Sequence, residues 1–588
     1  MNGRGPLFRK ILVANRGEIA LRVLRACREL GIAGVAVYGD DERDAPHVRY
    51  ADEAYRLPST QPLPYLDSEA LIAVARAAGA DAIHPGYGFL AENPAFARAC
   101  ADAGIVFIGP PPEAIAAMGD KVAARQVALD AGVPVVPGSD GAVDAAGAAA
   151  FAAAHGYPIA IKAAAGGGGR GFRVVWGPEE LAEAHRAAAG EAQRYFGDPT
   201  VYVERYLDHP RHIEIQIFAD AHGTVVSLGE RDCSIQRRHQ KLIEESPSPA
   251  LDPATRRRMG ETAIALARAV GYRGAGTVEF LYQDGAFFFL EMNTRIQVEH
   301  PVTELVTGID LVKEQIRVAA GCPLSFGADV PLVGHAIECR INAEDPARGF
   351  APTPGQITAY RAPAGFGVRV DSAAEPGSVI SPQYDSLIAK LIVWGRDRAE
   401  ALARLRRALG ELTVEGVATT IPFYRAVLDL PAFQRGEVDT RFLERHPELL
   451  QGLTPAPPAA APAADPPAAP ESYVVEVGGK RFDVRLFPVG GATPARRRPS
   501  GPRPRAGAAA PAGREELTSP IQGIVLSVAV APGDRVRQGD LICVIEAMKM
   551  ENEITAPHDG VVRALDVQPG QTVQIGARLA VIAAESGS

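Results

Sequence analysis

Residues 11–38 read ILVANRGEIALRVLRACRELGIAGVAVY, and this stretch determines the fold class of the N-terminal region. Ile11–Ala14 is a short apolar run of the kind that forms a buried strand. Gly17–Leu30 carries apolar residues at helical spacing, and Val35–Tyr38 is a second apolar run. A strand, a helix and a strand in this order predict a parallel, doubly wound α/β domain. Apolar segments and alanine-rich helices alternate in the same way to about residue 119.

A second α/β region begins at about residue 120. Tyr157–Ala163 and Phe172–Trp176 are apolar runs on either side of a glycine run at 166–169, and we expect both to form strands. Further strands are expected at 212–218, 276–282, 287–292, 337–341 and 387–393, with a helix at 398–409. The later elements predict a mixed α/β domain that ends near residue 450.

The composition changes near residue 451. Residues 451–470 contain seven Pro and eight Ala, a composition typical of an extended linker. Residues 473–487 alternate apolar and polar side chains around two glycines, which predicts a β-hairpin. From 515 to 584 the pattern G-x-V-x-x-x-x-V-x-P-G-x-x-V occurs twice, at 523–536 and at 560–573. This repeat predicts an all-β domain, a flattened barrel of two quasi-symmetric halves.

The overall composition excludes several classes of protein. The chain has 588 residues, enough for three to five domains, and its net charge is -9. A nucleic-acid-binding protein usually carries a basic domain or stripe, so we expect no nucleic-acid partner. No apolar run reaches the ~18 residues of a membrane helix, so we expect no membrane partner. The six cysteines stand singly, which argues against disulfides and zinc clusters, and the cytoplasm is the expected compartment.

Lys549 lies in the segment EAMKM (546–550), between the two halves of the repeat. A lysine at the tip of a predicted hairpin between two methionines is unusual for plain packing. The alternative is an ordinary surface lysine in a turn.

The glycine run at 166–169 follows Lys162 between two predicted strands. Glycines allow backbone N–H groups to approach phosphates, and a nearby lysine supplies positive charge. The spacing matches neither the P-loop pattern nor the dinucleotide-binding pattern. A flexible hairpin is the alternative.

Polar side chains interrupt two apolar strands at Glu279 and at Glu291, Asn293 and Arg295. Along the second strand the latter three are expected on one face. Carboxylate and amide oxygens are suitable ligands for Mg²⁺, and a solvated strand face is the alternative. The run from Glu230 to Lys241 is strongly charged, and by itself it is also compatible with a solvated surface loop.

Together these segments resemble biotin carboxylase, the ATP-grasp component of biotin-dependent carboxylases. The resemblance rests on ANRGEIA (14–20), HPGYGFLAEN (84–93), GERDCSIQRRHQK (229–241), EMNTRIQVEHPVTE (291–304) and ECRINAEDP (338–346). The C-terminal block with EAMKM resembles the biotin carboxyl carrier domain. The two resemblances cover about residues 7–450 and 515–584.

The resemblance implies five parts. They are a Rossmann-like N-terminal domain at 1–119, an ATP-grasp domain at 120–330 with a lid at about 133–204, a mixed α/β C-terminal domain at 331–450, a linker at 451–514 with the hairpin at 473–487, and a biotinyl/lipoyl-like flattened β-barrel at 515–584.

The resemblance also implies the role of individual residues. ATP would be bound by Lys121, Lys162, Gly166, Gly167, Gly168, Gly169, Glu204, Arg205, Tyr206, Leu207, His212, Gln236 and His239. Metal ligands would be Glu279, Glu291 and Asn293. Bicarbonate and biotin would be bound by Lys241, Arg295, Gln297, Val298 and Arg340. Lys241, Arg295, Glu299 and Arg340 would be catalytic, and Lys549 would be the biotinylated residue.

The implied reaction is the ATP-dependent carboxylation of covalently attached biotin by bicarbonate, with Mg²⁺ or Mn²⁺. Glu299 would deprotonate bicarbonate, which we expect to require a pKa tuned upward. Arg340 would hold the biotin enolate. Lys549 would receive its biotin from a biotin protein ligase.

Only 138 residues follow residue 450, too few for a carboxyltransferase domain, so a separate carboxyltransferase β subunit is expected. The layout resembles the α subunits of actinobacterial acetyl-/propionyl-CoA carboxylases of fatty acid biosynthesis, working as homo-oligomers within a large α/β complex. A methylcrotonyl-CoA carboxylase α subunit is the alternative. Such subunits usually carry a larger docking domain before the carrier, and the hairpin at 473–487 is too small for one, so the acetyl-/propionyl-CoA interpretation is preferred. Two further alternatives are an ATP-grasp ligase for another acid with a lipoylated carrier, and a non-catalytic carrier subunit.

Overall fold

The structure is a computed structural model that describes residues 7–139, 141–163, 172–196, 198–238, 240–455, 471–477, 480–486, 516–519, 523–547, 550–573 and 576–584. The glycine run at 166–169, His239, Lys549 and most of the predicted linker lie outside these residues. The chain forms two compact units that separate near residue 457, and each is described by itself. Among the described helices, none has both the length and the apolar character needed to span a membrane.

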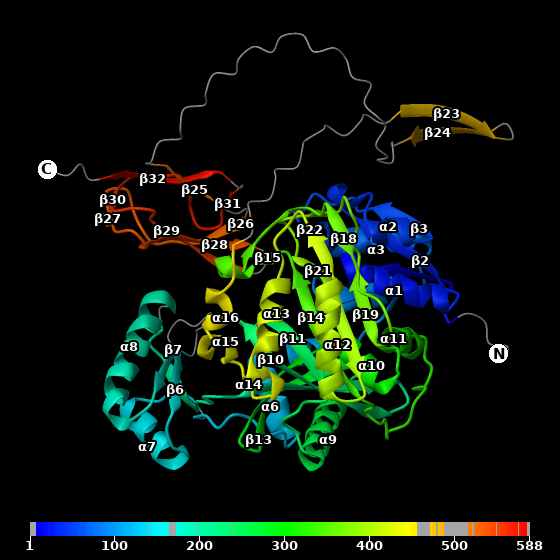
Figure 1. Cartoon of the computed structure of the whole chain (residues 1–588). Helices are drawn as coiled ribbons and strands as arrows, with labels where there is room; N and C mark the ends of the chain where they lie inside the picture. The colour runs from blue at the N-terminus through cyan, green and yellow to red at the C-terminus, as the bar shows by residue number, and fades with distance from the viewer. Residues whose placement is uncertain are drawn as a thin grey trace, which may run out of the picture. The chain divides into compact units, whose positions relative to one another are not determined.

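The first unit begins with a five-stranded parallel sheet in the order β3-β2-β1-β4-β5 (blue in Figure 1). Its strands are β1 (Lys10–Val13), β2 (Ala33–Tyr38), β3 (Glu53–Arg56), β4 (Ala82–His84) and β5 (Val106–Phe107), and its helices are α1 (Gly17–Glu29), α2 (Pro46–Tyr50), α3 (Ser68–Ala78), α4 (Pro94–Asp102) and α5 (Pro112–Gly119). The apolar positions of α1, among them Ile19, Val23 and Cys27, are buried in the core. The predicted strand–helix–strand unit is confirmed.

The central feature of this unit is an eight-stranded antiparallel sheet in the order β13-β12-β9-β10-β11-β14-β21-β19. The strands are β9 (Arg211–Ala219), β10 (Val225–Arg237), β11 (Gln240–Ser246), β12 (Gly274–Gln283), β13 (Ala286–Asn293), β14 (His335–Asn342), β19 (Val368–Ser372) and β21 (Leu387–Gly395). Because β11 pairs with β14, strands from both sides of the boundary predicted at residue 330 belong to one sheet. The two predicted domains are therefore joined through their backbones at this point.

Helices cover this sheet. They are α6 (Lys121–Asp130), α9 (Pro253–Ala269), α10 (His300–Thr307), α11 (Leu311–Ala319), α12 (Arg398–Glu411), α13 (Ile421–Asp429), α14 (Pro431–Gln434), α15 (Phe442–Arg445) and α16 (Glu448–Gln451). Small strand pairs complete the region: β15 (Glu344–Asp345) with β16 (Ala351–Pro352), β17 (Gly355–Gln356) with β20 (Val379–Ile380), and β18 (Ala359–Arg361) with β22 (Thr413–Glu415). Figure 1 shows α12 and α13 in front of the sheet, where Leu405 and Tyr424 are buried with Ile337 and Leu391.

A smaller three-stranded sheet, β7-β6-β8, carries the segment around the glycine run. Its strands are β6 (Ile159–Ala163), β7 (Phe172–Val175) and β8 (Val201–Arg205), and α7 (Ala145–His155) and α8 (Pro178–Phe196) pack on it (cyan in Figure 1). β6 and β7 pair in antiparallel register, Lys162 opposite Phe172, so the glycine run joins two neighbouring strands as predicted.

Glu245 on β11 ties α12 to the sheet. Its carboxylate accepts a hydrogen bond from Arg398 Nε at 2.7 Å, and His335 Nε2 lies 2.7 Å from it. Burial alone would raise the pKa of Glu245, but the hydrogen bond from His335 and the charge of Arg398 outweigh it and lower the pKa to about 2. The folded state therefore favours the ionised form of this carboxyl group.

We expect Glu245→Gln to lower the free energy of unfolding at pH 7 by about 3 kcal/mol, because the pKa is depressed by more than two units on folding. This contribution is complete above the unfolded pKa, near 4.5, and is lost as the pH falls from there toward about 2. Urea denaturation of both proteins between pH 7 and pH 3 measures it. A stability difference that does not narrow below pH 4.5 would contradict the expectation.

The second unit contains the predicted hairpin and the repeat. The hairpin pairs β23 (Glu471–Val477) with β24 (Lys480–Leu486). The repeat forms two four-stranded sheets, β25-β32-β30-β27 and β29-β28-β26-β31. Their strands are β25 (Glu516–Thr518), β26 (Gly523–Val528), β27 (Arg535–Val536), β28 (Leu541–Ala547), β29 (Met550–Thr555), β30 (Gly560–Leu565), β31 (Thr572–Val573) and β32 (Arg578–Ala584).

The repeated valines explain this barrel. Val525 and Val562 occupy the same position in the two halves and are both fully buried, and Val536 and Val573 are the next such pair. The first pair lies on the central strands β26 and β30 of the two sheets, so each half supplies matching core residues. The predicted two-sheet β domain is confirmed.

Candidate active site

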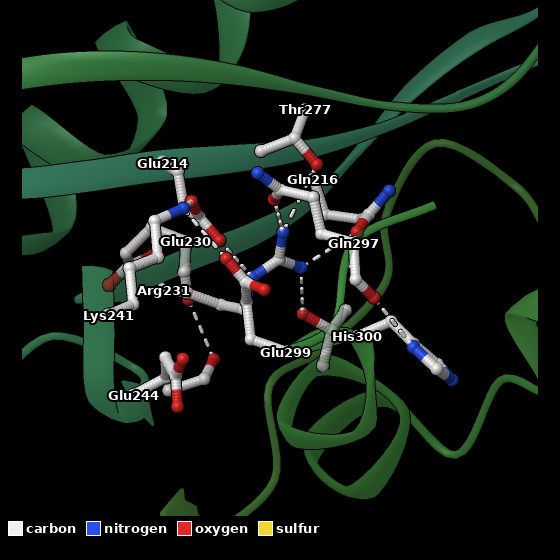
Figure 2. Close-up of polar contacts among 12 residues, drawn as sticks. Glu214, Gln216, Glu230, Arg231, Lys241, Glu244, Thr277, Gln297, Glu299 and His300 are labelled. Carbon is white, nitrogen blue, oxygen red and sulfur yellow. Dashed lines mark hydrogen bonds and ion pairs between the residues drawn. The ribbon is translucent and has the colours of Figure 1, made fainter. Parts of the chain in front are cut away.

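Arg231, in the middle of β10, is the buried centre of the polar network in Figure 2. Its side chain is fully buried, and its nitrogens make five hydrogen bonds. Nε donates to Glu214 at 2.5 Å, Nη1 donates to Gln216 at 2.7 Å and Thr303 at 2.9 Å, and Nη2 donates to Thr277 at 3.1 Å and Gln297 at 2.7 Å. Because these partners come from β9, β12, α10 and the loop before α10, Arg231 fixes that loop to the sheet.

Lys241, at the start of β11, points into the same network. Its Nζ lies 2.5 Å from Glu214, 2.9 Å from Glu279 and 2.7 Å from Glu299. Burial alone would lower the pKa of Lys241, but the three carboxylates outweigh it and raise it well above its usual range. Lys241 is therefore a permanent positive charge at the centre of three buried acids.

Glu299 lies between Lys241 and Arg340. Its Oε1 is 2.7 Å from Lys241 Nζ, and its Oε2 accepts from Arg340 Nη2 at 2.9 Å. Burial alone would raise the pKa of Glu299, but Lys241, Arg340 and Arg231 outweigh it and hold it well below its usual range. The expectation of a pKa tuned upward is wrong for the protein without its substrates, because the sequence does not reveal three cations around one carboxylate.

Glu279 and Glu291 are directly opposite each other on β12 and β13. Oε1 of Glu279 accepts from Lys241 and from the amides of Asn293 at 2.9 Å and Gln297 at 2.7 Å, and His212 Nε2 lies 2.8 Å from Oε2. Burial and the charge of Glu279 raise the pKa of Glu291. Two facing carboxylates that repel each other, with an amide beside them, fit a divalent cation with oxygen ligands.

Arg295 lies just beyond the end of β13, in the loop that leads to α10, rather than on the strand as predicted. Its Nε donates to Glu92 Oε2 at 2.9 Å, and its Nη2 donates to Asn293 Oδ1 at 2.7 Å. Thr294 N also donates to Glu92, at 2.9 Å. A residue from the N-terminal sheet region therefore positions the loop that carries Arg295, Gln297 and Val298.

The residues predicted to bind ATP lie in two groups. Lys162 on β6 donates to Glu204 on β8 at 2.5 Å, and Arg205, Tyr206 and Leu207 follow Glu204 along the chain. Lys121 begins α6 and is exposed, and its positive charge acts to lower the pKa of Glu291. The remaining described members of the set, His212 and Gln236, are buried on β9 and β10. Gly166–Gly169 and His239 lie outside the described residues.

Lys549 also lies outside the described residues. The strands on either side of it are described: β28 ends at Ala547, β29 begins at Met550, and these two residues pair with each other. In the sequence, the position predicted for biotinylation thus lies between the ends of two paired strands.

The sequence analysis missed Glu214, Arg231, Glu92 and Glu244. Glu244 accepts from Arg340 Nε at 2.6 Å and is fully buried. Arg231 lies within the segment 230–241 and Glu244 follows it. A solvated surface loop remained an alternative for this segment, and that alternative is wrong, because 230–236 is a buried strand. Glu230, Arg231 and Asp232 are consecutive rather than alternating with apolar residues, so the period of a strand did not reveal that this run is buried.

Comparison with known proteins gives four family matches along the chain. Residues 7–115 match the N-terminal domain of biotin carboxylase, residues 120–326 the ATP-binding domain of the carbamoyl-phosphate synthase L chain, residues 338–445 the C-terminal domain of biotin carboxylase, and residues 515–582 the biotin-requiring enzyme domain.

Individual relatives cover most of the chain. A pyruvate carboxylase subunit of Methanothermobacter thermautotrophicus is 57% identical over 443 residues, which are 75% of this chain and 90% of that protein. The biotin-dependent acyl-coenzyme A carboxylase alpha3 subunit of Mycobacterium leprae is 50% identical over 561 residues, 92% of this chain and 93% of its own length. The solved biotin carboxylase domain of a thermophilic 2-oxoglutarate carboxylase, bound to ADP, is 50% identical with a TM-score of 0.73, and the match covers 76% of this chain and 100% of that one.

Proposed function

This chain belongs to the biotin carboxylase family as an ATP-grasp ligase with a biotin carrier domain, and from this premise we propose that it is the α subunit of an acetyl-CoA or propionyl-CoA carboxylase. In this role it carboxylates the biotin on its own carrier domain and delivers the carboxyl group to a separate carboxyltransferase β subunit. The observation that carries the proposed chemistry is the buried Glu299, held between Lys241 and Arg340.

Bicarbonate binds between Lys241 and Arg340, with Arg295, Gln297 and Val298 lining its pocket. Lys241 and Arg340 balance the charge of bicarbonate. Each cation then interacts with two anions, bicarbonate and Glu299, instead of with Glu299 alone. An added negative charge beside Glu299 raises the pKa of this carboxylate from its depressed value. Glu299 thereby becomes a better base when its substrate is bound, and it accepts the bicarbonate proton at a carboxylate oxygen.

ATP supplies the activation, since bicarbonate is a poor electrophile. Lys121, Lys162 and the glycine run bind the phosphates, while Glu204–Leu207, His212, Gln236 and His239 bind the rest of the nucleotide. Glu279, Glu291 and Asn293 would hold Mg²⁺, which would supply charge neutralisation for the transferring phosphoryl group. Lys241 contacts both Glu279 and Glu299, so its ammonium group links the proposed metal ligands to the proposed base. Phosphoryl transfer then depends chiefly on positioning and charge neutralisation.

Lys549 carries the biotin, which it receives from a biotin protein ligase. Biotin on this lysine would supply a ureido nitrogen that gives its proton to the phosphate released from ATP and accepts the carboxyl group. Arg340 would balance the negative charge on the biotin ring. The linker at 451–514 lets the carrier domain reach this site and that of the partner at a high effective concentration.

The acetyl-CoA or propionyl-CoA assignment is supported by the Mycobacterium leprae acyl-coenzyme A carboxylase subunit, whose match extends through the carrier domain. The relatives that match only the carboxylase region are named for different acceptors: pyruvate for the Methanothermobacter subunit and 2-oxoglutarate for the solved carboxylase domain. The carboxylase region alone therefore carries no acceptor preference, and the carboxyltransferase partner selects the acyl-CoA. A methylcrotonyl-CoA acceptor is the second candidate.

The test is retention of labelled bicarbonate carbon on the purified chain with ATP and Mg²⁺. We expect label on the biotinylated wild type and none on Lys549→Arg, because an arginine side chain cannot be biotinylated. Absence of label from a wild type shown by mass to carry biotin would contradict the proposed chemistry. Chasing the labelled complex, isolated with its carboxyltransferase partner, with acetyl-CoA, propionyl-CoA or methylcrotonyl-CoA then identifies the acceptor.

A further inference from the structure

Two buried carboxyl groups lie behind Arg340, and the reaction described above uses neither. Glu244 on β11 and Glu338 on β14 are cross-strand partners, and both are fully buried. Arg340 follows Glu338 by two residues on β14, and Lys390 is opposite Arg340 on β21. Because side chains alternate along a strand, these four groups share one face of the eight-stranded sheet.

Of the two buried carboxyl groups, only Glu244 forms a hydrogen bond with Arg340. Arg340 Nε donates to Glu244 Oε1 at 2.6 Å, and Arg340 Nη2 donates to Glu299 Oε2 at 2.9 Å. Glu244 therefore holds Nε of the guanidinium group while Nη2 faces the proposed base. Among the described residues, Oε2 of Glu244 and both carboxyl oxygens of Glu338 have no hydrogen-bond partner.

The charges around Glu244 explain this arrangement. The charged groups that act on Glu244 are Arg340 and Glu338 on β14, Glu299 before α10 and Lys241 on its own strand. Cys339 and Tyr424 are packed in the apolar core with Ile243, on the opposite face of the sheet. Burial raises the pKa of Glu244 to about 7, and Arg340 opposes this rise. Burial also raises the pKa of Glu338 well above its usual range, and the charge of Glu244 adds to the effect. Burial therefore favours the protonated form of Glu338 more strongly than that of Glu244, whose pKa lies closer to neutral pH.

We propose that Glu244 is a positioning residue for Arg340: its carboxylate anchors Nε, so that Nη2 stays directed at Glu299 and at the anion bound there. This inference rests on the proposed function. When Glu299 accepts a proton it loses its charge, and Arg340 loses one of its two anionic partners. The fixed bond to Glu244 then keeps the long, flexible arginine side chain in place for the remaining anion.

The inference predicts a pH dependence with a defined sign. Below pH 7 Glu244 takes up a proton, its bond to Arg340 is no longer between two charges, and activity falls. Above pH 7 the bond is between charged groups, and activity is full. Glu244→Gln resembles the protonated form at every pH, so wild type and variant should differ most at alkaline pH.

The experiment measures kcat/KM for bicarbonate in ADP release with free biotin, from pH 6 to pH 8.5, with wild type, Glu244→Gln and Glu244→Asp. Dividing the kcat/KM of wild type by that of the variant at each pH removes the effect of bicarbonate ionisation, because this effect is the same for both enzymes. We expect Glu244→Gln to be about 10- to 100-fold slower at pH 8.5 and to approach the wild type near pH 6. Glu244→Asp should restore the slope with pH, because it restores an ionisable group on the anchoring side.

Glu245→Gln is the matched control. Glu245 is the next residue on β11, points to the opposite face, is equally buried and also pairs with an arginine. The Glu245→Gln variant should be less stable than wild type. The ratio of its kcat/KM for bicarbonate to that of wild type should not change with pH. If the wild type is active but the ratio of its kcat/KM to that of Glu244→Gln does not change with pH, the inference is wrong. It is also wrong if Glu245→Gln shows the same change of ratio with pH. Either result leaves the proposed function intact. A wild type without bicarbonate-dependent ADP release would instead overturn the proposed function on which it rests.

Discussion

Glu299→Gln is expected to lower kcat for bicarbonate-dependent ADP release by about 10²- to 10⁴-fold, the usual contribution of a general base. The amide has nearly the same shape, but its single oxygen can replace only one of the two oxygens that accept from Lys241 and Arg340. It cannot hold the proton that bicarbonate gives up. Glu299 is only 2% exposed, so bulk water does not take over its role.

Steady-state ADP release with free biotin, in the presence and absence of bicarbonate, measures this loss. Glu230→Gln is the control, because Glu230 is also fully buried and paired with an arginine, Arg256 at 2.7 Å, but contacts none of the proposed substrates. We expect this control to keep kcat within about threefold of wild type, since surrounding groups outside the site rarely alter chemistry directly. If Glu299→Gln retained more than a tenth of the wild-type rate, Glu299 would not be the base.

Arg231→Met is expected to lower the free energy of unfolding of the first unit by about 3–5 kcal/mol and to abolish measurable carboxylation. Methionine fills much of the same volume but donates no hydrogen bond. The substitution leaves the oxygens of Gln216, Thr277, Gln297 and Thr303 without their donor in a region that water does not reach. Gln297 then loses its anchor, and the loop that carries Glu299 is no longer held to the sheet.

Urea denaturation and ADP release measure the two effects in the same preparations. Arg231→Lys should lie between wild type and Arg231→Met, because it keeps the charge near Glu214 but replaces a planar five-donor group by a single ammonium. Arg256→Met provides the comparison on the neighbouring ion pair: Arg256 is 26% exposed, so water can replace part of what is lost. A free energy of unfolding within about 1 kcal/mol of wild type for Arg231→Met would show that the network is not a stabilising centre.

The sequence by itself determined the helices and strands whose formation depends on residues close together in the chain. The helix and strands at 11–38, the strands at 212–218 and 387–393, and the valine repeat of the C-terminal domain all follow from local periodicity. That information is local, because an amphipathic helix or strand needs only the right residues at spacings of two, three or four. Motifs with fixed spacing, such as EAMKM, determined the resemblance to biotin carboxylase and its carrier for the same reason.

Only the tertiary structure decided which charged groups meet. Glu214, Lys241, Glu299 and Arg340 come from three strands and a loop, and their contacts depend on the pairing of β9 with β10 and of β11 with β14, each with its own register. A shift of one residue would turn Arg231 or Glu244 to the opposite face of the sheet. The direction of the pKa of Glu299 follows from this assembly, because burial and three surrounding cations act in opposite senses and only their distances determine which prevails.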